Sequence, residues 1–101
     1  MVKATFYLPL HDNDGRDLHA EIQAVEDECF VAFGVWTQMG FFKGAWRMES
    51  GLKQVDTHAV YTIVLRKSQL GELETILQRF KAKTTQEAIY LETGSVTIRL
   101  L

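Results

Sequence analysis

The chain has 101 residues, 47% of them hydrophobic and 24% charged, which is the composition of one globular domain and excludes a disordered chain. Its formal net charge is −2 and its basic residues are scattered, so we expect no nucleic-acid partner, because such proteins concentrate positive charge against phosphate. The single cysteine cannot form an internal disulfide, the first residues lack a signal-peptide pattern, and no apolar run approaches the roughly 20 residues of a membrane span. We therefore expect a cytoplasmic protein with no membrane contact.

Residues 4–10 are predicted to form the first strand. Apolar side chains occupy every second position and share one face: Ala4, Phe6, Leu8 and Leu10. Thr5 and Tyr7 lie on the other face. Pro9 has no amide donor, which favours the end of the strand or an edge of the sheet.

A helix follows, with Asp17 as its predicted N-cap and Gly34 as the residue that ends it. Its apolar residues recur at intervals of three and four, as in a helix buried along one side: Leu18, Ile22, Val25, Cys29 and Phe33. Cys29 belongs to this stripe, and acidic residues such as Glu28 lie next to it in the sequence. We therefore expect a buried, unreactive thiol.

The middle of the chain is predicted to form a hairpin. Residues 35–48 are aromatic and punctuated by glycine, which indicates a broken or bulged strand that is most regular over 42–48. Residues 49–51 turn the chain, and residues 55–66 form the clearest strand. One face of this strand carries Val55, Ala59, Tyr61, Ile63 and Leu65, and the other carries Asp56, His58, Val60, Thr62 and Val64.

Ser68 is the predicted cap of a second helix. The buried stripe of this helix consists of Leu70, Leu73, Ile76, Leu77 and Phe80. Residues 87–92 and 95–101 then flank Thr93-Gly94, which predicts a final two-stranded hairpin.

The predicted order is β-α-β-β-α-β with the last strand doubled, so the fold class is α+β and ferredoxin-like, βαββαβ(β), in one domain covering residues 1–101. Each helix has one apolar stripe, so both are expected on one face of an antiparallel sheet. The stretches Phe33-Gly34 and Gly44-Ala45-Trp46, followed by a strand, a helix and a final hairpin, resemble small bacterial ferredoxin-like families close to the dimeric α+β barrel group. The resemblance implies the fold and assigns no catalytic residue.

The sheet face away from the helices is predicted to be half-apolar. It carries Thr5 and Tyr7 from the first strand and Val60, Thr62 and Val64 from the third. Either it is a solvated face with scattered apolar residues, or a second copy packs on it face to face. We predict a homodimer through this open face, which in dimeric α+β barrels also encloses a ligand cavity.

No residue pattern predicts a metal site or a cofactor. The loop Asp12–Gly15 can be aligned with a calcium-binding loop only by placing Leu10 at the first ligand position, so we predict an ordinary turn. The three histidines, His11, His19 and His58, have no metal-ligand spacing. His11 and His58 could lie near each other in the fold, either as a general base or as two solvent-facing side chains.

Aromatic residues are the remaining candidates for binding, and Tyr7, Trp36 and Trp46 are nominated for a small-molecule ligand. Residues 43–46 resemble only the opening of an RNA-recognition motif and lie on the wrong strand, which disfavours RNA. The expected function is therefore a homo-oligomeric binding or interaction module without a catalytic motif. The alternative is a cofactor-independent enzyme of monooxygenase or isomerase type on the dimeric α+β barrel plan, with His58 and His11 as weak catalytic candidates.

Overall fold

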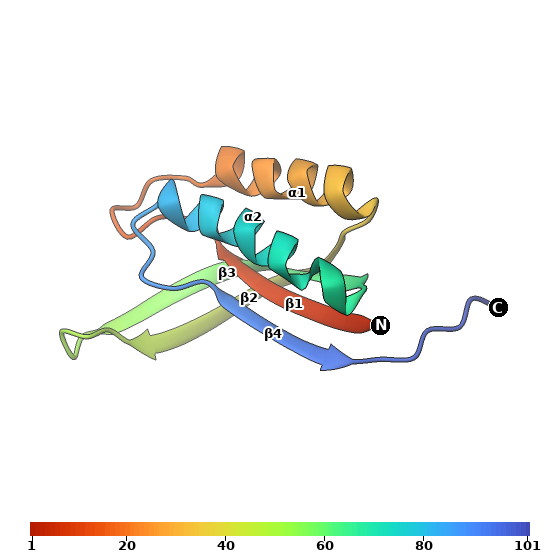
Figure 1. Ribbon diagram of the computed structural model, residues 1–101. Helices are drawn as coiled ribbons and strands as arrows, with labels where there is room; N and C mark the ends of the chain where they lie inside the picture. Colours follow the sequence, from red (N-terminus) through yellow and green to blue (C-terminus); the bar gives the residue numbers. More distant parts are fainter.

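A computed structural model describes all residues, Met1–Leu101, and shows the predicted ferredoxin-like α+β fold. Four strands form one antiparallel sheet in the order β2-β3-β1-β4, and both helices cover the same face of it (Figure 1). The elements are β1 (Val2–Pro9), α1 (His19–Phe33), β2 (Thr37–Arg47), β3 (Lys53–Leu65), α2 (Leu70–Ala82) and β4 (Tyr90–Ser95). Neither helix has the length and apolar character needed to cross a membrane.

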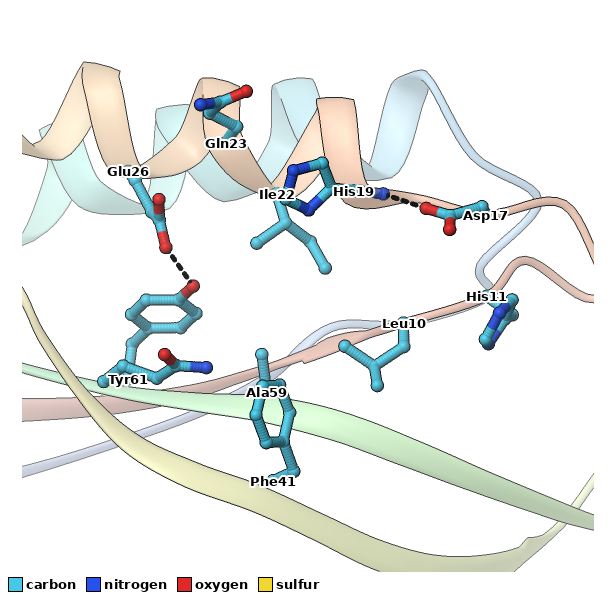
Figure 2. A pocket seen from close by; sticks show the side chains of 11 residues that line it. Leu10, His11, Asp17, His19, Ile22, Gln23, Glu26, Phe41, Ala59 and Tyr61 are labelled. Carbon is cyan, nitrogen blue, oxygen red and sulfur yellow. Dashed lines mark hydrogen bonds between the residues drawn. The ribbon is translucent and has the colours of Figure 1, made fainter.

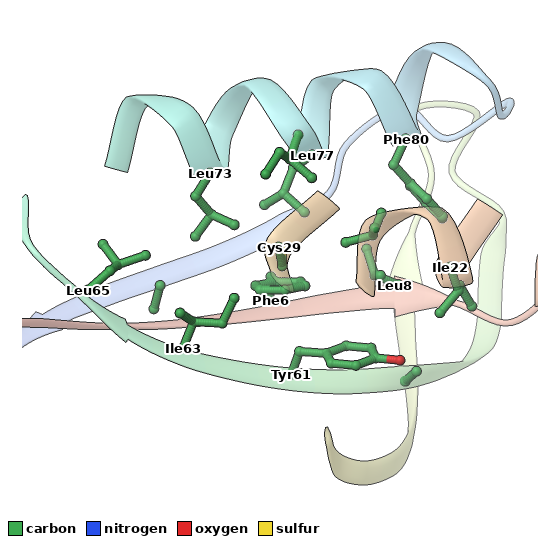
Figure 3. Packing of buried hydrophobic residues seen from close by; sticks show 14 of the residues in the cluster. Phe6, Leu8, Ile22, Cys29, Tyr61, Ile63, Leu65, Leu73, Leu77 and Phe80 are labelled. Atoms are coloured by element: carbon green, nitrogen blue, oxygen red, sulfur yellow. The ribbon is translucent and has the colours of Figure 1, made fainter. Parts of the chain in front are cut away.

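The core lies between the helices and the two central strands, β1 and β3 (Figure 3). Strand alternation supplies the sheet side of the core with Ala4, Phe6, Leu8, Ala59, Tyr61, Ile63 and Leu65, all 2% exposed or less. The helix stripes supply the other side with Leu18, Ile22, Val25, Cys29, Leu73, Ile76, Leu77 and Phe80. Phe6 and Tyr61 stack at the centre, with ring centroids 5.5 Å apart. The predicted core is therefore confirmed, except that Val55 is exposed and that Leu10, Phe33 and Leu70 are only partly buried at its margin.

Helix α1 ends at Gly34 as predicted, but its N-cap is Leu18 and not the predicted Asp17. The Asp17 carboxylate accepts a hydrogen bond of 2.6 Å from the backbone N–H of His19, although Leu18 occupies the N-cap position itself. Gly34 adopts φ 74°, and its N–H donates to the carbonyl of Phe30. A residue with a β-carbon is strained at such a φ, which explains the glycine.

The predicted cap of the second helix is wrong. Ser68 lies inside a single 3₁₀ turn, Lys67–Gln69, that precedes α2. The side chain of Gln69 accepts a hydrogen bond of 2.9 Å from the backbone N–H of Arg66 and closes this turn. The helix is therefore entered through the 3₁₀ turn, and Ser68 makes no cap hydrogen bond.

The predicted final hairpin is also wrong. Thr93 and Gly94 lie within β4 and pair with Ala4 and Lys3 of β1. Gly94 does not have the positive φ that a tight hairpin turn needs. The long antiparallel partner β1 fixes the register here and overrides the local turn signal, and residues 96–101 continue without regular structure.

Strands β2 and β3 extend beyond the rest of the sheet. Strand β3 pairs with β1 only over residues 58–65, whereas its residues 53–57 pair with residues 43–47 of β2 alone. Residues 43–57 thus form a two-stranded hairpin arm, seen at the left of Figure 1. The predicted bulge lies between Gln38 and Gly40. With this arm the molecule measures 46 × 23 × 22 Å.

Candidate functional site

Aromatic side chains from all four strands converge on the open face of the sheet. Tyr7 of β1 pairs in register with Tyr90 of β4, and Phe42 of β2 pairs with His58 of β3. Paired residues of an antiparallel sheet point to the same face, and Trp46 follows Phe42 on that face at an even spacing. These five residues line a groove of about 740 Å³, which we call the aromatic groove. One wall is the hairpin arm and the other is the segment 86–91.

Tyr7 is the centre of the aromatic groove. Its ring centroid lies 4.6 Å from that of Tyr90, 6.1 Å from Phe42 at an interplanar angle of 84°, and 6.1 Å from His58. These are the tilted and edge-to-face arrangements that aromatic rings prefer. Phe42 and Tyr90 remain 48% and 51% exposed, so the groove presents ring surface to whatever enters it.

Polar groups stand at the floor and rim of the aromatic groove. The Asp56 carboxylate accepts hydrogen bonds from Gln54 Nε2 at 2.9 Å and from Trp46 Nε1 at 3.4 Å, which holds the indole in place. Burial lowers the pKa of His58, and the Asp56 carboxylate offsets this only in part. The imidazole is therefore neutral near pH 7 and can accept or donate one hydrogen bond.

Val60 lies on the open face but is not available to a partner. Its neighbours in the register are Tyr7 on β1 and Gly40 on β2, and it is only 2% exposed. The alternation of residues in β3 predicts correctly that Val60 lies on the open face. It does not show that neighbouring side chains cover Val60 there. Thr62 and Val64 are half-buried on the same face.

A second, smaller pocket of about 290 Å³ lies on the helix side, between α1 and strands β2 and β3 (Figure 2). His11 and His19 stand at one end of it, and Tyr61 donates a hydrogen bond to the Glu26 carboxylate at the other. Burial and Glu26 raise the pKa of Tyr61, so its hydroxyl remains a donor. Within this helix-side pocket, Tyr61 and Glu26 already satisfy each other through their hydrogen bond.

The nominated residues therefore divide between two places. Tyr7, Trp46 and His58 line the aromatic groove, whereas His11 lines the helix-side pocket. Trp36 lies outside the groove and packs edge-on against Tyr61, with centroids 5.8 Å apart. The structure does not bring His11 and His58 into one site.

The loop after β1 carries a feature that the sequence pattern did not reveal. Asp12 is 5% exposed, and its carboxylate accepts hydrogen bonds from the Thr85 N–H at 2.9 Å, the Thr85 hydroxyl at 2.6 Å and Gln86 Nε2 at 3.0 Å. Arg16 adds an ion pair at 3.2 Å. Burial alone would raise the pKa of Asp12, but the hydrogen bonds outweigh it and hold the pKa well below its usual value.

This arrangement, which we call the Asp12 clamp, joins the β1–α1 loop to the segment that walls the aromatic groove. Gln86 belongs both to the clamp and to the groove lining. The predicted ordinary surface turn is therefore only partly right, because Asp12 is buried and holds the loop to residues 85 and 86. No group of three or more His, Cys, Asp or Glu side chains is arranged to hold a metal ion.

No model of a known protein family matches the chain, and no curated protein is significantly similar to it. The interpretation of the aromatic groove therefore rests on its geometry and chemistry.

Proposed function

We propose that this protein is a small homo-oligomeric binding module whose aromatic groove takes a planar, mostly apolar small molecule. The observation that carries the proposal is the convergence of Tyr7, Phe42, Trp46 and Tyr90 around about 740 Å³ of open space. Ligand sites are concave, mainly apolar and supplied with a few polar groups that fix orientation, and their volumes fall in this range. His58 and Gln86 are the polar groups that a ligand would meet.

A second copy is expected to cover the open face. The chain exposes 6612 Å², whereas a monomer of 11.6 kDa is expected to expose about 5800 Å². The excess reflects the extended shape of the chain, 46 × 23 × 22 Å, and leaves apolar surface that a partner would cover. An isolated two-stranded hairpin is marginally stable in water, so the hairpin arm also favours a partner that packs on it. Packing two open faces together would enclose the groove.

The test uses the two tryptophans, which lie in different places. In the variant Trp36→Phe, the only remaining indole is Trp46 in the aromatic groove, so its fluorescence reports binding there. We expect saturable changes on titration with planar aromatic probes, starting with 8-anilinonaphthalene-1-sulfonate and followed by uncharged bicyclic compounds. A probe whose ring stacks on Tyr7 and Tyr90 would exclude water from the neighbouring Trp46 indole and so change its fluorescence.

The matched variants separate the groove from nonspecific apolar surface. Tyr90→Ala in the Trp36→Phe background removes one stacking ring and is expected to weaken binding about tenfold, since such a contact contributes about 1.5 kcal/mol. Val31→Ala removes an apolar side chain, 86% exposed, from the outside of α1 and should leave binding unchanged. Equal binding by both variants would contradict the proposal.

The second candidate is a cofactor-independent enzyme, and the state of His58 favours it. A general base must be unprotonated at the working pH and near its substrate, and His58 is a neutral imidazole at the groove. If bound compounds are converted, kcat in His58→Gln should fall by at least about a hundredfold while the dissociation constant changes little. A binding module would show only the binding.

A further inference from the structure

Two parts of the chain have sequences typical of paired strands but lack a neighbouring strand. Residues 96–100 alternate apolar and polar side chains, with Val96, Ile98 and Leu100 on one side, as in a strand. Beyond the hydrogen bond from the Val96 N–H to the carbonyl of Met1, at 3.1 Å, this segment leaves the sheet (Figure 1). Ile98 is 48% and Leu100 is 96% exposed.

The other part is the free edge of β2. This strand has 11 residues, and none of them is fully buried. Met39, Phe41 and Phe42 are 54%, 62% and 48% exposed, while Lys43 and Arg47 are its only charged residues. Proteins usually protect a sheet edge with charges, proline or shortness, and an edge that is long and apolar is a template for another strand.

The helix side of this edge is apolar as well. Phe41 points toward the helices and lines the helix-side pocket. On α1, Phe30 follows Glu26 by one helical turn and is 61% exposed. Since Glu26 reaches Tyr61, Phe30 lies on the flank of α1 nearest β2. A strand added beside β2 would find apolar surface on the side of the sheet that the helices only partly cover.

We propose that residues 96–101 of a second copy pair along the free edge of β2 as a fifth strand, with Val96, Ile98 and Leu100 on the helix side, over Phe41. The proposal rests on the proposed function only in requiring two copies. Backbone hydrogen bonds would supply affinity, and the alternate apolar side chains would set the register, as in other cases of strand addition.

Residues 96–101 of the same chain cannot supply this strand. Strands β2 and β4 are opposite edges of the sheet, with β3 and β1 between them. A strand beside β2 lies four strand spacings from β4, about 19 Å, and a chain extended at about 3.4 Å per residue would use all of residues 96–101 to cross that distance. The outer edge of β4 is a poorer acceptor, since this strand has only six residues, among them Glu92.

Disulfide trapping tests the proposal. Ile98→Cys is combined in turn with Gln38→Cys, Phe41→Cys or Lys43→Cys, which sample the helix-side positions of β2. The native thiol does not interfere, because Cys29 is 1% exposed and burial, with Glu28, raises its pKa to about 12. Under mild oxidation we expect at least one pair to give a dimer on a non-reducing gel. The control pair, Ile98→Cys with Thr75→Cys on the exposed face of α2, should give none.

The outcomes separate this proposal from the dimer itself. Cross-linking between chains at β2 supports strand exchange. A protein that is dimeric by light scattering but cross-links at no β2 position overturns strand exchange and leaves the proposed dimer intact. A monomer at all concentrations overturns both, and a cross-link within one chain overturns the exchange alone.

A second variant avoids dependence on oxidation. Ile98→Lys places a charge in the proposed strand, at a site already exposed in the single chain, so folding should not suffer. We expect the dimer dissociation constant to rise at least about tenfold, since the charge would be buried beside β2, whose only charged residues, Lys43 and Arg47, have the same sign. Thr75→Lys is the matched control and should not change it. Equal dissociation constants for both variants would overturn the proposal.

Discussion

Asp12 shows how much one side chain can organise in a fold of this size. It is the only charged side chain that the structure buries, and its hydrogen bonds reach residues 73 and 74 positions later in the chain. Both oxygens accept hydrogen bonds and the Arg16 guanidinium pairs with one of them at 3.2 Å, so the buried charge is compensated. Since Gln86 also lines the aromatic groove, the Asp12 clamp positions one wall of the candidate site.

Replacing this carboxylate should destabilise the protein and change its acid response. Asp12→Asn presents an amide group to donors from Thr85 and Gln86, so we expect a loss of about 2 kcal/mol in the free energy of unfolding. In the wild type, the lowered pKa means that the unfolded state binds the proton first. The contribution is thus complete above the unfolded pKa of about 3.9 and is lost as the pH falls below it.

Urea unfolding at pH values from 7 down to 2.5 measures both effects. The variant should lose less stability than the wild type over the acidic part of this range. Asp14→Asn is the control, because Asp14 is exposed and accepts a single hydrogen bond from the Arg16 N–H. An equal acid slope in Asp12→Asn and the wild type would contradict the assignment.

The burial or role of a single residue could be predicted from the sequence only where the residues that determine it lie close by in the chain. Cys29 was correctly predicted to be buried, since its stripe of apolar neighbours lies within one helix. The role of Asp12 could not be predicted, because Thr85 and Gln86 carry no signal that links them to a loop more than seventy residues away.

At the scale of elements, two glycines in comparable helices should respond in opposite ways to the same change. Gly34 ends α1 with φ 74°, where a β-carbon is strained, so Gly34→Ala should cost about 1–2 kcal/mol of stability. Gly71 lies in the first turn of α2, and a β-carbon there meets no atom within 4 Å. Gly71→Ala should therefore add about 0.5–1 kcal/mol. Thermal unfolding of both variants beside the wild type measures the difference, and a shift in the same direction would contradict the reasoning.

The elements themselves were largely predictable because their burial is periodic. The stripes of α1 and α2 and the alternation of β1 and β3 all match the observed core. The errors lie where contacts with other parts of the chain determine the local structure. Gly94 is part of a turn pattern but continues β4 along β1. Ser68 is a typical helix cap but lies inside a 3₁₀ turn. The register of β1 with β4 is a long-range property that local propensity does not contain.

At the scale of the molecule, the proposed dimer makes a prediction that does not depend on the groove or on residues 96–101. Val64 is half-buried on the open face, away from the aromatic groove, and Val64→Arg should break a face-to-face dimer by placing a charge in the interface. Light scattering between about 1 and 100 μM should show the wild type as a dimer and the variant as a monomer. Thr75→Arg, on the exposed face of α2, should remain dimeric, and a dimeric Val64→Arg would count against this interface.

Only part of the candidate site could be predicted from the sequence. Tyr7, Trp46 and His58 were nominated, and the groove contains them. Phe42 was noticed only as one of several aromatics, and Tyr90 was missed. Their place in the groove follows from two pairings, Tyr7 with Tyr90 and Phe42 with His58. Strand alternation gives the face of a residue, but the residue beside it on that face depends on register.

The free edge of β2 and the unpaired segment 96–101 also bear on how many copies can assemble. Each chain has one of each, so each chain can donate one strand and accept one. When two chains exchange strands reciprocally, every donor and acceptor is used and the assembly closes with twofold symmetry. When a chain receives its strand from a third copy, the assembly either closes as a ring, in which every acceptor is used, or grows as a filament with one acceptor open at its end. A substitution at Ser95, where β4 ends and the donated segment begins, could change the direction of that segment. It would then alter the number of copies that assemble without changing either pairing surface.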